Sequence, residues 1–234
     1  EFNFSSVFAD NAFAGHDRIS DAHQLTAGVT SRLISPETGG EILRLGIAQR
    51  YLLRDQRVAP ALDGTPDGEP LTQSLSDLLL LGSTTVLPNW SLDAALQYSP
   101  DSARLRRSVL GATYTPAPFQ TINLRYRLAR GLSEQVEAGW QWPIFRGAPG
   151  GGSSCRGTVY GVGRLSYSLR DSRITDALAG VEYDAGCWIA RVVAERVSTG
   201  QTEATTRLML QLELVGLSRL GSNPLQVLKE NIPG

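Results

Sequence analysis

The clearest pattern in the chain is an alternation of apolar and polar positions over residues 207–217. The apolar face of this segment consists of Leu208, Leu210, Leu212 and Leu214. Gln211 and Glu213 fall on the opposite face. A period of two indicates a β-strand, because successive side chains of a strand point to opposite sides of the sheet. The same pattern recurs at near-regular spacing along the chain, which favours a barrel or a sandwich.

About eleven segments follow this alternation, and each is bounded by residues that favour turns. The predicted strands cover residues 22–33, 41–53, 76–87, 90–99, 105–115, 119–130, 134–145, 157–169, 173–184, 186–198 and 204–217. The fold class that follows is all-β, with an antiparallel arrangement of strands.

The two faces of these strands differ in a way that separates a barrel from a sandwich. The apolar faces include Leu43, Leu45 and Ile47, the alternate residues Trp90, Leu92, Ala94, Leu96 and Tyr98, and Trp188 with Val192. The opposite faces carry charge, for example at Asp93, Glu137 and Glu195. A sandwich core requires neither charge on one face nor aromatic residues near strand ends, whereas a membrane barrel has a polar lumen and aromatic girdles. We therefore predict a segment of a transmembrane β-barrel, part of a larger barrel.

Composition is compatible with this prediction and narrows the alternatives. The chain has 234 residues, 41% of them hydrophobic, and its mean hydropathy is −0.13. No run approaches the roughly 18 apolar residues of a membrane-spanning helix, so a helical membrane protein is excluded. A net charge of −1 gives no support for a nucleic-acid partner. The chain opens at Glu1 without a start methionine or signal peptide, and we expect it to be a piece of something longer.

An odd number of strands cannot form a whole bacterial barrel, which has an even number. We therefore expect an open sheet with two free edges. Short turns at Pro88–Asn89, residues 115–118 and Asp184–Ala185 fall at one end of the strands, and the long loop over residues 54–75 falls at the other. Because bacterial barrels have short periplasmic turns and long outer loops, this assigns the short turns to the periplasm. The long Gly-rich segment 147–157 does not fit that assignment.

Catalytic and metal-binding patterns are weak. His16 and His23 are the two histidines, and neither has the spacing of a metal site. Ser20, Asp21 and His23 are close in sequence, as a hydrolase triad would require in space, but no Gly-x-Ser-x-Gly motif accompanies them. We expect no enzyme, no metal and no cofactor.

Positive charge is carried almost entirely by arginine, since Lys229 is the single lysine. Guanidinium groups bind phosphate through two parallel hydrogen bonds. The arginines that alternation assigns to the polar face are Arg44, Arg125, Arg127, Arg164 and Arg191. These candidate lumen arginines could hold anions or a phosphorylated glycolipid, although a GC-rich genome would produce the same bias towards arginine.

Several stretches, in order and spread over nearly the whole chain, resemble one family. The first is a loop motif whose residues include Asn11, Phe13, Gly15, Asp17, Arg18 and Asp21, followed by Ala22 to Thr26. Further stretches are 47–51, 178–184, 187–188, 212–217 and the closing Ile232-Pro233-Gly234. Together they are similar to the C-terminal barrel of the LptD family of lipopolysaccharide-assembly outer-membrane proteins, also called the organic solvent tolerance family.

The resemblance implies a function that alternation alone does not. Family members form a very large barrel in the cell outer membrane, receive lipopolysaccharide from a periplasmic bridge that includes LptA, and insert it into the outer leaflet. The lipoprotein LptE sits inside the barrel as a plug, and a soluble periplasmic domain precedes the barrel. The resemblance thus implies that residues 1–21 are an extracellular or mouth loop, 22–217 are barrel strands and loops, and 218–234 are a C-terminal tail. A general porin and, less so, an outer-membrane acyl hydrolase are the alternatives.

The cysteines depart from the family pattern. The family often has two adjacent cysteines after the Tyr-Asp turn, each bonded to the N-terminal region, whereas here the pair reads Gly186-Cys187. The resemblance implies a disulfide from Cys187 to a cysteine outside this chain, at the periplasmic rim. Cys155 is an alternative partner if its Cα lies within about 7 Å of that of Cys187. A further alternative is that Cys187 is a small buried residue beneath Trp188.

Overall fold

The computed structural model describes residues 6–8, 23–55, 74–146, 157–198, 204–215 and, for the backbone, 218–221. It is built from strands apart from one short 3₁₀ turn, η1 (Ser6–Phe8). The strands are β1 (Gln24–Ile34), β2 (Glu41–Leu52), β3 (Leu78–Thr84), β4 (Trp90–Ser99), β5 (Arg104–Ala117), β6 (Gln120–Ala129), β7 (Ser133–Arg146), β8 (Thr158–Ser168), β9 (Arg173–Asp184), β10 (Trp188–Ser198), β11 (Ala204–Leu214) and β12 (Ser218–Gly221).

All eleven predicted strands are present, with ends that differ from the prediction by up to three residues. The all-β antiparallel fold class is therefore confirmed. β12 is an addition, because Ser218–Gly221 falls in the predicted C-terminal tail. No helix in the described ranges is long and apolar enough to cross a membrane.

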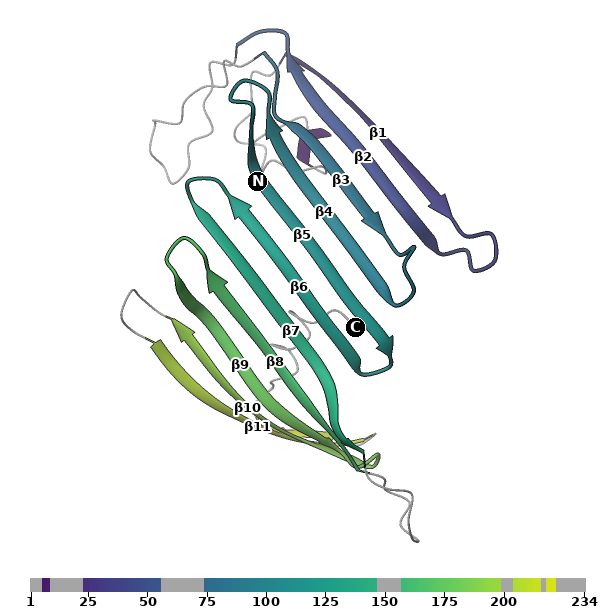
Figure 1. Cartoon of the computed structure of the whole chain (residues 1–234), viewed down its shortest axis with the longest axis vertical. Coiled ribbons are helices and arrows are strands. Elements are labelled where there is room, and N and C mark those ends of the chain that lie inside the picture. Colours follow the sequence, from purple (N-terminus) through teal and green to yellow (C-terminus); the bar gives the residue numbers. More distant parts are fainter. Residues whose placement is uncertain are drawn as a thin grey trace. The chain divides into compact units, whose positions relative to one another are not determined.

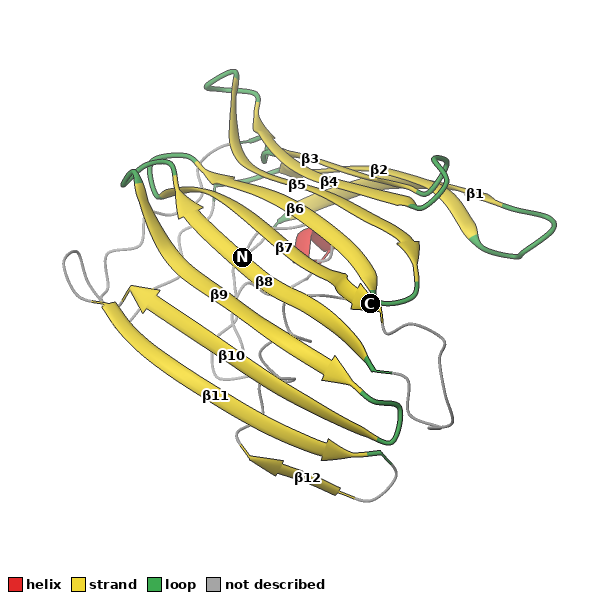
Figure 2. Cartoon of the chain, turned by 60° about the horizontal axis from the view of Figure 1, so that its bottom comes forward, coloured by secondary structure: helices red, strands yellow, loops and turns green. Residues whose placement is uncertain are grey.

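The chain divides into two compact units (Figure 1). The first comprises Glu1–Val86 and Asp93–Val109, and the second Leu87–Leu92 and Leu110–Gly234. In the first unit, β1 pairs with β2 along nearly its whole length, and β2 pairs with β3 through Leu43 to Ala48. In the second, β6 to β12 pair in chain order, each antiparallel to the next (Figure 2). Consecutive strands therefore meet through hairpins, and no crossover intervenes.

Free edges follow from these pairings. Among the described residues β1 pairs only with β2, and β12 pairs only with β11, through Gln211 to Leu214. The predicted pair of free edges is confirmed in this part of the chain. The argument from an odd strand count is wrong, however, because β12 brings the described strands to twelve. The unpaired backbone of the edges is the better reason to regard the sheet as open.

Tight turns set the register of the hairpins. Gly131 (φ +79°) and Gly186 (φ +81°) adopt the left-handed conformation, which glycine reaches without steric cost. The Gly186 amide donates to Asp184 Oδ1 at 2.7 Å, which fixes the β9–β10 turn. In the second unit, short turns occur at both ends of the strands, at 118–119 and 185–187 and at 130–132 and 169–172. Turn length therefore does not distinguish the two ends there, and residues 147–156 lie outside the described part.

Candidate functional site

Antiparallel pairing places directly opposed residues on the same side of a sheet, so the register defines two faces of the second unit. Arg125 opposes Glu137, and Arg164 opposes Leu178. Leu178 in turn opposes Glu195, which opposes Arg207. We call the side that carries these residues the polar face. The opposite side, with Leu124, Val181, Leu208 and Leu210 among others, is the apolar face.

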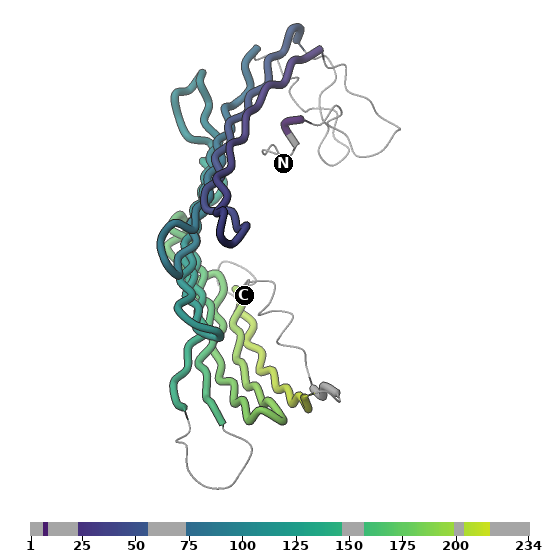
Figure 3. Tube along the Cα trace, turned by 90° about the vertical axis from the view of Figure 1, so that its right-hand side faces the viewer, coloured from purple at the N-terminus to yellow at the C-terminus, as the bar shows by residue number. Residues whose placement is uncertain are grey.

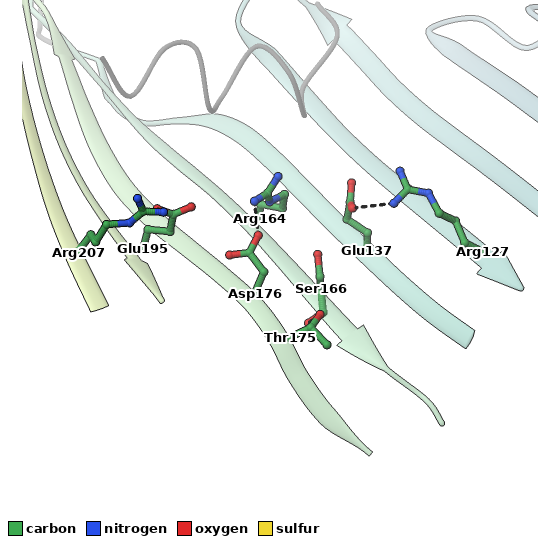
Figure 4. A network of polar contacts seen from close by, with 8 residues as sticks. All are labelled: Arg127, Glu137, Arg164, Ser166, Thr175, Asp176, Glu195 and Arg207. Carbon is green, nitrogen blue, oxygen red and sulfur yellow. Dashed lines mark hydrogen bonds and ion pairs between the residues drawn. The ribbon is translucent and has the colours of Figure 1, made fainter. Parts of the chain in front are cut away.

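Ion pairs link neighbouring strands across the polar face (Figure 4). Arg127 Nη1 lies 3.5 Å from Glu137 Oε2, which connects β6 to β7. Arg164 Nη2 donates to Asp176 Oδ2, which connects β8 to β9. Arg207 Nη2 lies 3.0 Å from Glu195 Oε2, which connects β11 to β10 (Figure 4). Each arginine therefore already has a carboxylate partner on an adjacent strand.

Arg191 forms the most buried of these ionic groups. Its Nε donates to Glu182 Oε2 on β9, and its Nη1 donates to Glu213 Oε2 on β11 at 2.8 Å. The side chains of Arg191, Glu182 and Glu213 are only 6%, 10% and 17% exposed. Charges removed from water to this degree are stable only when paired, so this triad ties three strands together.

A small apolar strip interrupts the polar face beside this triad. Val162, Leu178 and Val193 are buried, and Met209 packs against them. Val193 opposes Gly180, where a Cβ would lie 2.7 Å from Val193 Cγ2. The absent side chain of Gly180 is therefore the reason that Val193 fits. Alternation alone assigned these positions to the charged side and missed the strip.

The predicted lumen arginines are distributed over both units. Arg125, Arg127, Arg164 and Arg191 share the polar face of the second unit, whereas Arg44 lies on β2 in the first unit, with Nε 2.8 Å from Glu41 Oε1. Among the described residues, Arg125 alone of these five has no carboxylate partner. A phosphate would have to displace a carboxylate from each of the other four. Of these acidic partners, the alternation placed only Glu137 on the charged face. A hairpin with a four-residue turn over 185–188 would also have indicated that Glu182 opposes Arg191.

In the first unit, η1 packs against β2 (Figure 3), and Arg50 of that strand bonds to it. Val7 is fully buried with Ala48 and Leu79. Its carbonyl oxygen accepts hydrogen bonds from Arg50 Nη2 and, at 3.4 Å, from Thr26 Oγ1. A residue ahead of the first strand is therefore fixed to the polar side of the sheet.

The apolar face exposes large side chains that a soluble protein would cover. Leu208 is 67% exposed and Leu210 56%. Aromatic residues contact one another where strands begin or end, as in the pairs Trp90–Tyr114 and Tyr183–Trp188, with ring centroids 4.8 and 5.1 Å apart. Contiguous exposed apolar surface with aromatic residues at the strand ends is typical of a face that meets lipid.

Cys187 lies in the β9–β10 turn and is exposed, with its thiol 3.8 Å from the carbonyl oxygen of Ala185. The alternative in which Cys187 is buried beneath Trp188 is therefore wrong. Ala185 is the buried residue of this turn, and Trp188 packs against Tyr183 instead. Cys155 and the loop-motif residues Asn11, Phe13, Gly15, Asp17, Arg18 and Asp21 lie outside the described residues.

Comparison with known proteins decides the family. The model of the family described as "LptD: LPS transport system D" matches residues 1–147, which is more than half of the chain. The chain belongs to the LptD family. The resemblance inferred from the loop motif and the later stretches is confirmed.

Relatives named LPS-assembly protein LptD match over the whole chain. The protein from Polaromonas sp. is 47% identical over 240 residues, and the one from Albidiferax ferrireducens is 45% identical over 241. The Thiobacillus denitrificans relative is 39% identical over 234 residues. The alignments cover 100% of this chain and 29–30% of each relative, so the chain spans about three tenths of the length of these LptD proteins.

Proposed function

We propose that this chain is part of an outer-membrane β-barrel that inserts lipopolysaccharide into the outer leaflet. The observation that carries the proposal is the match to LptD proteins along the entire chain. The division into a charged face and an exposed apolar face supports it, because a barrel wall needs one side for water and the other for hydrocarbon.

A wall with one charged face and one apolar face suits lipopolysaccharide as the substrate. Lipopolysaccharide combines an anionic sugar head with several acyl chains, so its head must travel in water while its tails remain in hydrocarbon. The polar face presents arginines that are mostly balanced by carboxylates, as in the Arg164–Asp176 pair. Such a surface can pass an anionic head without trapping it, because a phosphate must compete with an existing partner. No chemical step on the lipid is required of these residues.

The proposal includes partners and orientation. We infer that a plug lipoprotein of the LptE kind occupies the lumen and that a bridge of the LptA kind delivers the lipid from the periplasm. Cys187 marks the periplasmic rim, where the compartment is oxidising and supports a disulfide to the N-terminal region of the complete protein. Its exposure in the β9–β10 turn leaves the thiol accessible to such a partner.

A segment exchange tests the function. In a conditional LptD mutant of Polaromonas, the segment aligned with this chain is replaced by this chain, and lipopolysaccharide at the cell surface is quantified after depletion of the resident protein. Restored surface lipopolysaccharide and growth support the proposal. A chimera that reaches the outer membrane in normal amount but restores neither would contradict it. A general porin would instead raise the uptake of small solutes in liposomes, which serves as the companion measurement.

A further inference from the structure

Two neighbouring turns of the second unit enclose a hollow that the function above does not use. The β6–β7 and β8–β9 turns lie side by side (Figure 1), and residues of both turns line the hollow. Its volume is about 600 Å³. We call it the rim hollow, and the residues that matter in it are Tyr126, Leu128, Arg130, Leu132, Glu134 and Arg170.

Arg170 joins the two turns. Its Nη1 donates to the carbonyl oxygens of Gly131 and Leu132, the second at 2.6 Å. A guanidinium carries five N–H donors in a planar fork, and Nη1 supplies two of them. Among the described contacts the three donors on Nε and Nη2 have no partner, which leaves one edge of the fork available to an anion. The hydrogen bonds of Nη1 thus hold the Arg170 side chain in place, and its Nε and Nη2 groups are available to bind an anion.

The charge balance of the rim hollow is positive. Arg130 and Arg170 both line it, and the only lining carboxylate in the described part of the chain is Glu134. Glu134 Oε1 accepts a hydrogen bond from the Tyr126 hydroxyl at 2.9 Å. Asp171, next in sequence to Arg170, is not part of the lining and accepts from Ser168 Oγ at 2.9 Å. The lining of the rim hollow therefore carries two positive charges and one negative charge.

Apolar side chains border the same hollow. Leu128 and Leu132 line it, and Leu132 is 71% exposed. Leu128 and Tyr126 alternate with Arg127 along β6, so both lie on the apolar face. The hollow therefore joins cationic groups at the turns to the hydrocarbon-like surface of the strands. That combination matches an amphiphile with an anionic head, because an inorganic anion gains nothing from leucine.

We propose that the rim hollow binds the phosphate head of an anionic membrane lipid, with Arg130 and Arg170 on the phosphate and Leu128 and Leu132 on the acyl chains. The proposal rests on the function above in one respect, namely that the apolar face meets the membrane. It adds a lipid site on the outside of the wall, distinct from the ion pairs of the polar face.

The test uses the complete protein, purified in an uncharged detergent and titrated calorimetrically with dihexanoyl phosphatidic acid. Replacing both arginines, Arg130→Gln with Arg170→Gln, should weaken binding about 10-fold or more, a loss of at least about 1.4 kcal/mol, because charge-assisted hydrogen bonds to the phosphate are lost. Arg196→Gln is the matched control. Arg196 is an exposed arginine on the apolar face of β10, outside the hollow, and its replacement should change the affinity less than twofold, a difference of under about 0.4 kcal/mol.

Further variants separate recognition from folding. Arg130→Gln alone leaves the Arg170 contacts to the turn intact and should still weaken binding, while Leu132→Ser should weaken the lipid and leave inorganic phosphate unaffected. The proposal is overturned if every variant binds as the unmodified protein does, or if inorganic phosphate binds as tightly as the lipid. Lipid binding is measured in detergent and does not depend on export. Absence of lipid binding would therefore not change the interpretation of the segment exchange, and failure of the exchange would not change the interpretation of the binding data.

Discussion

Replacing Arg191 by methionine is the sharpest test of the ion pairs on the polar face. The substitution keeps a long side chain at a position that is 6% exposed and removes the guanidinium that binds the carboxylate of Glu182, whose side chain is only 10% exposed. Removing one member of a buried ionic group costs about 3–5 kcal/mol, because a charge such as that of Glu182 then loses its partner without gaining water. We expect Arg191→Met to lower the free energy of unfolding by that amount.

The matched control is Arg127→Met. Arg127 makes the same kind of cross-strand pair with Glu137, but at 3.5 Å and with its side chain 46% exposed. Exposed pairs contribute about 0–1 kcal/mol, so this variant should be nearly as stable as the unmodified protein. The triple variant Arg191→Met, Glu182→Gln, Glu213→Gln also replaces the two carboxylates by neutral amides. It should recover more than half of the lost free energy of unfolding.

The assay is urea denaturation of the complete protein in phospholipid vesicles, followed by tryptophan fluorescence. Equal losses for Arg191→Met and Arg127→Met would refute the reasoning, because burial would then make no difference. A triple variant no more stable than Arg191→Met would refute it as well, since the loss would then come from packing.

Three further results are expected. Cys187→Ser should abolish a mobility shift of the complete protein on non-reducing gels and reduce lipopolysaccharide export; unchanged mobility with intact export would mean that no disulfide tether exists. The double substitution Asp17→Ala, Arg18→Ala should reduce barrel assembly, measured as heat-modifiable mobility, because both charged residues belong to the loop motif by which the chain resembles its family; normal assembly and export would show that neither process depends on them. Gly163→Val should destabilise β8, because a Cβ at Gly163 would lie 2.2 Å from Cζ2 of the Trp140 ring, and a shift in tryptophan emission would report it; stability equal to that of the unmodified protein would show that the ring moves aside without cost.

The alternation of apolar and polar residues predicted the strands well, because the period of two is a property of each strand by itself. The chain repeats this pattern from strand to strand. The alternation also assigned Arg125, Arg127, Arg164 and Arg191 to one side, which the register of β6 to β10 reproduces. These properties depend only on spacing within a strand or across one hairpin.

Other features depend on residues distant in sequence, and alternation had no means of predicting them. Val193 is buried on a charged face because the opposing residue is Gly180, a fact of register rather than of composition. Val7 belongs to a three-residue turn that is too short to show a period, and its burial arises from Ala48 and Leu79. β12 has four residues, which are too few to show a recognisable alternation.

The ion pairs have a consequence for how the strands find their partners. A one-residue slip in the pairing of two strands would move the apolar residues of one strand to the polar face, so the alternation disfavours it. A two-residue slip keeps every apolar residue on the apolar face. Moving β10 two residues against β9 in one direction would set Glu195 opposite Asp176 and Arg191 opposite Gly180. Moving it in the other direction would set Glu182 opposite Val193, although Arg191 would then face Asp184. Charge thus disfavours the first slip, which hydrophobicity alone treats as equal to the observed alignment. Together with the fit of Val193 against Gly180, these charges make the observed alignment of β9 and β10 more stable than its neighbours.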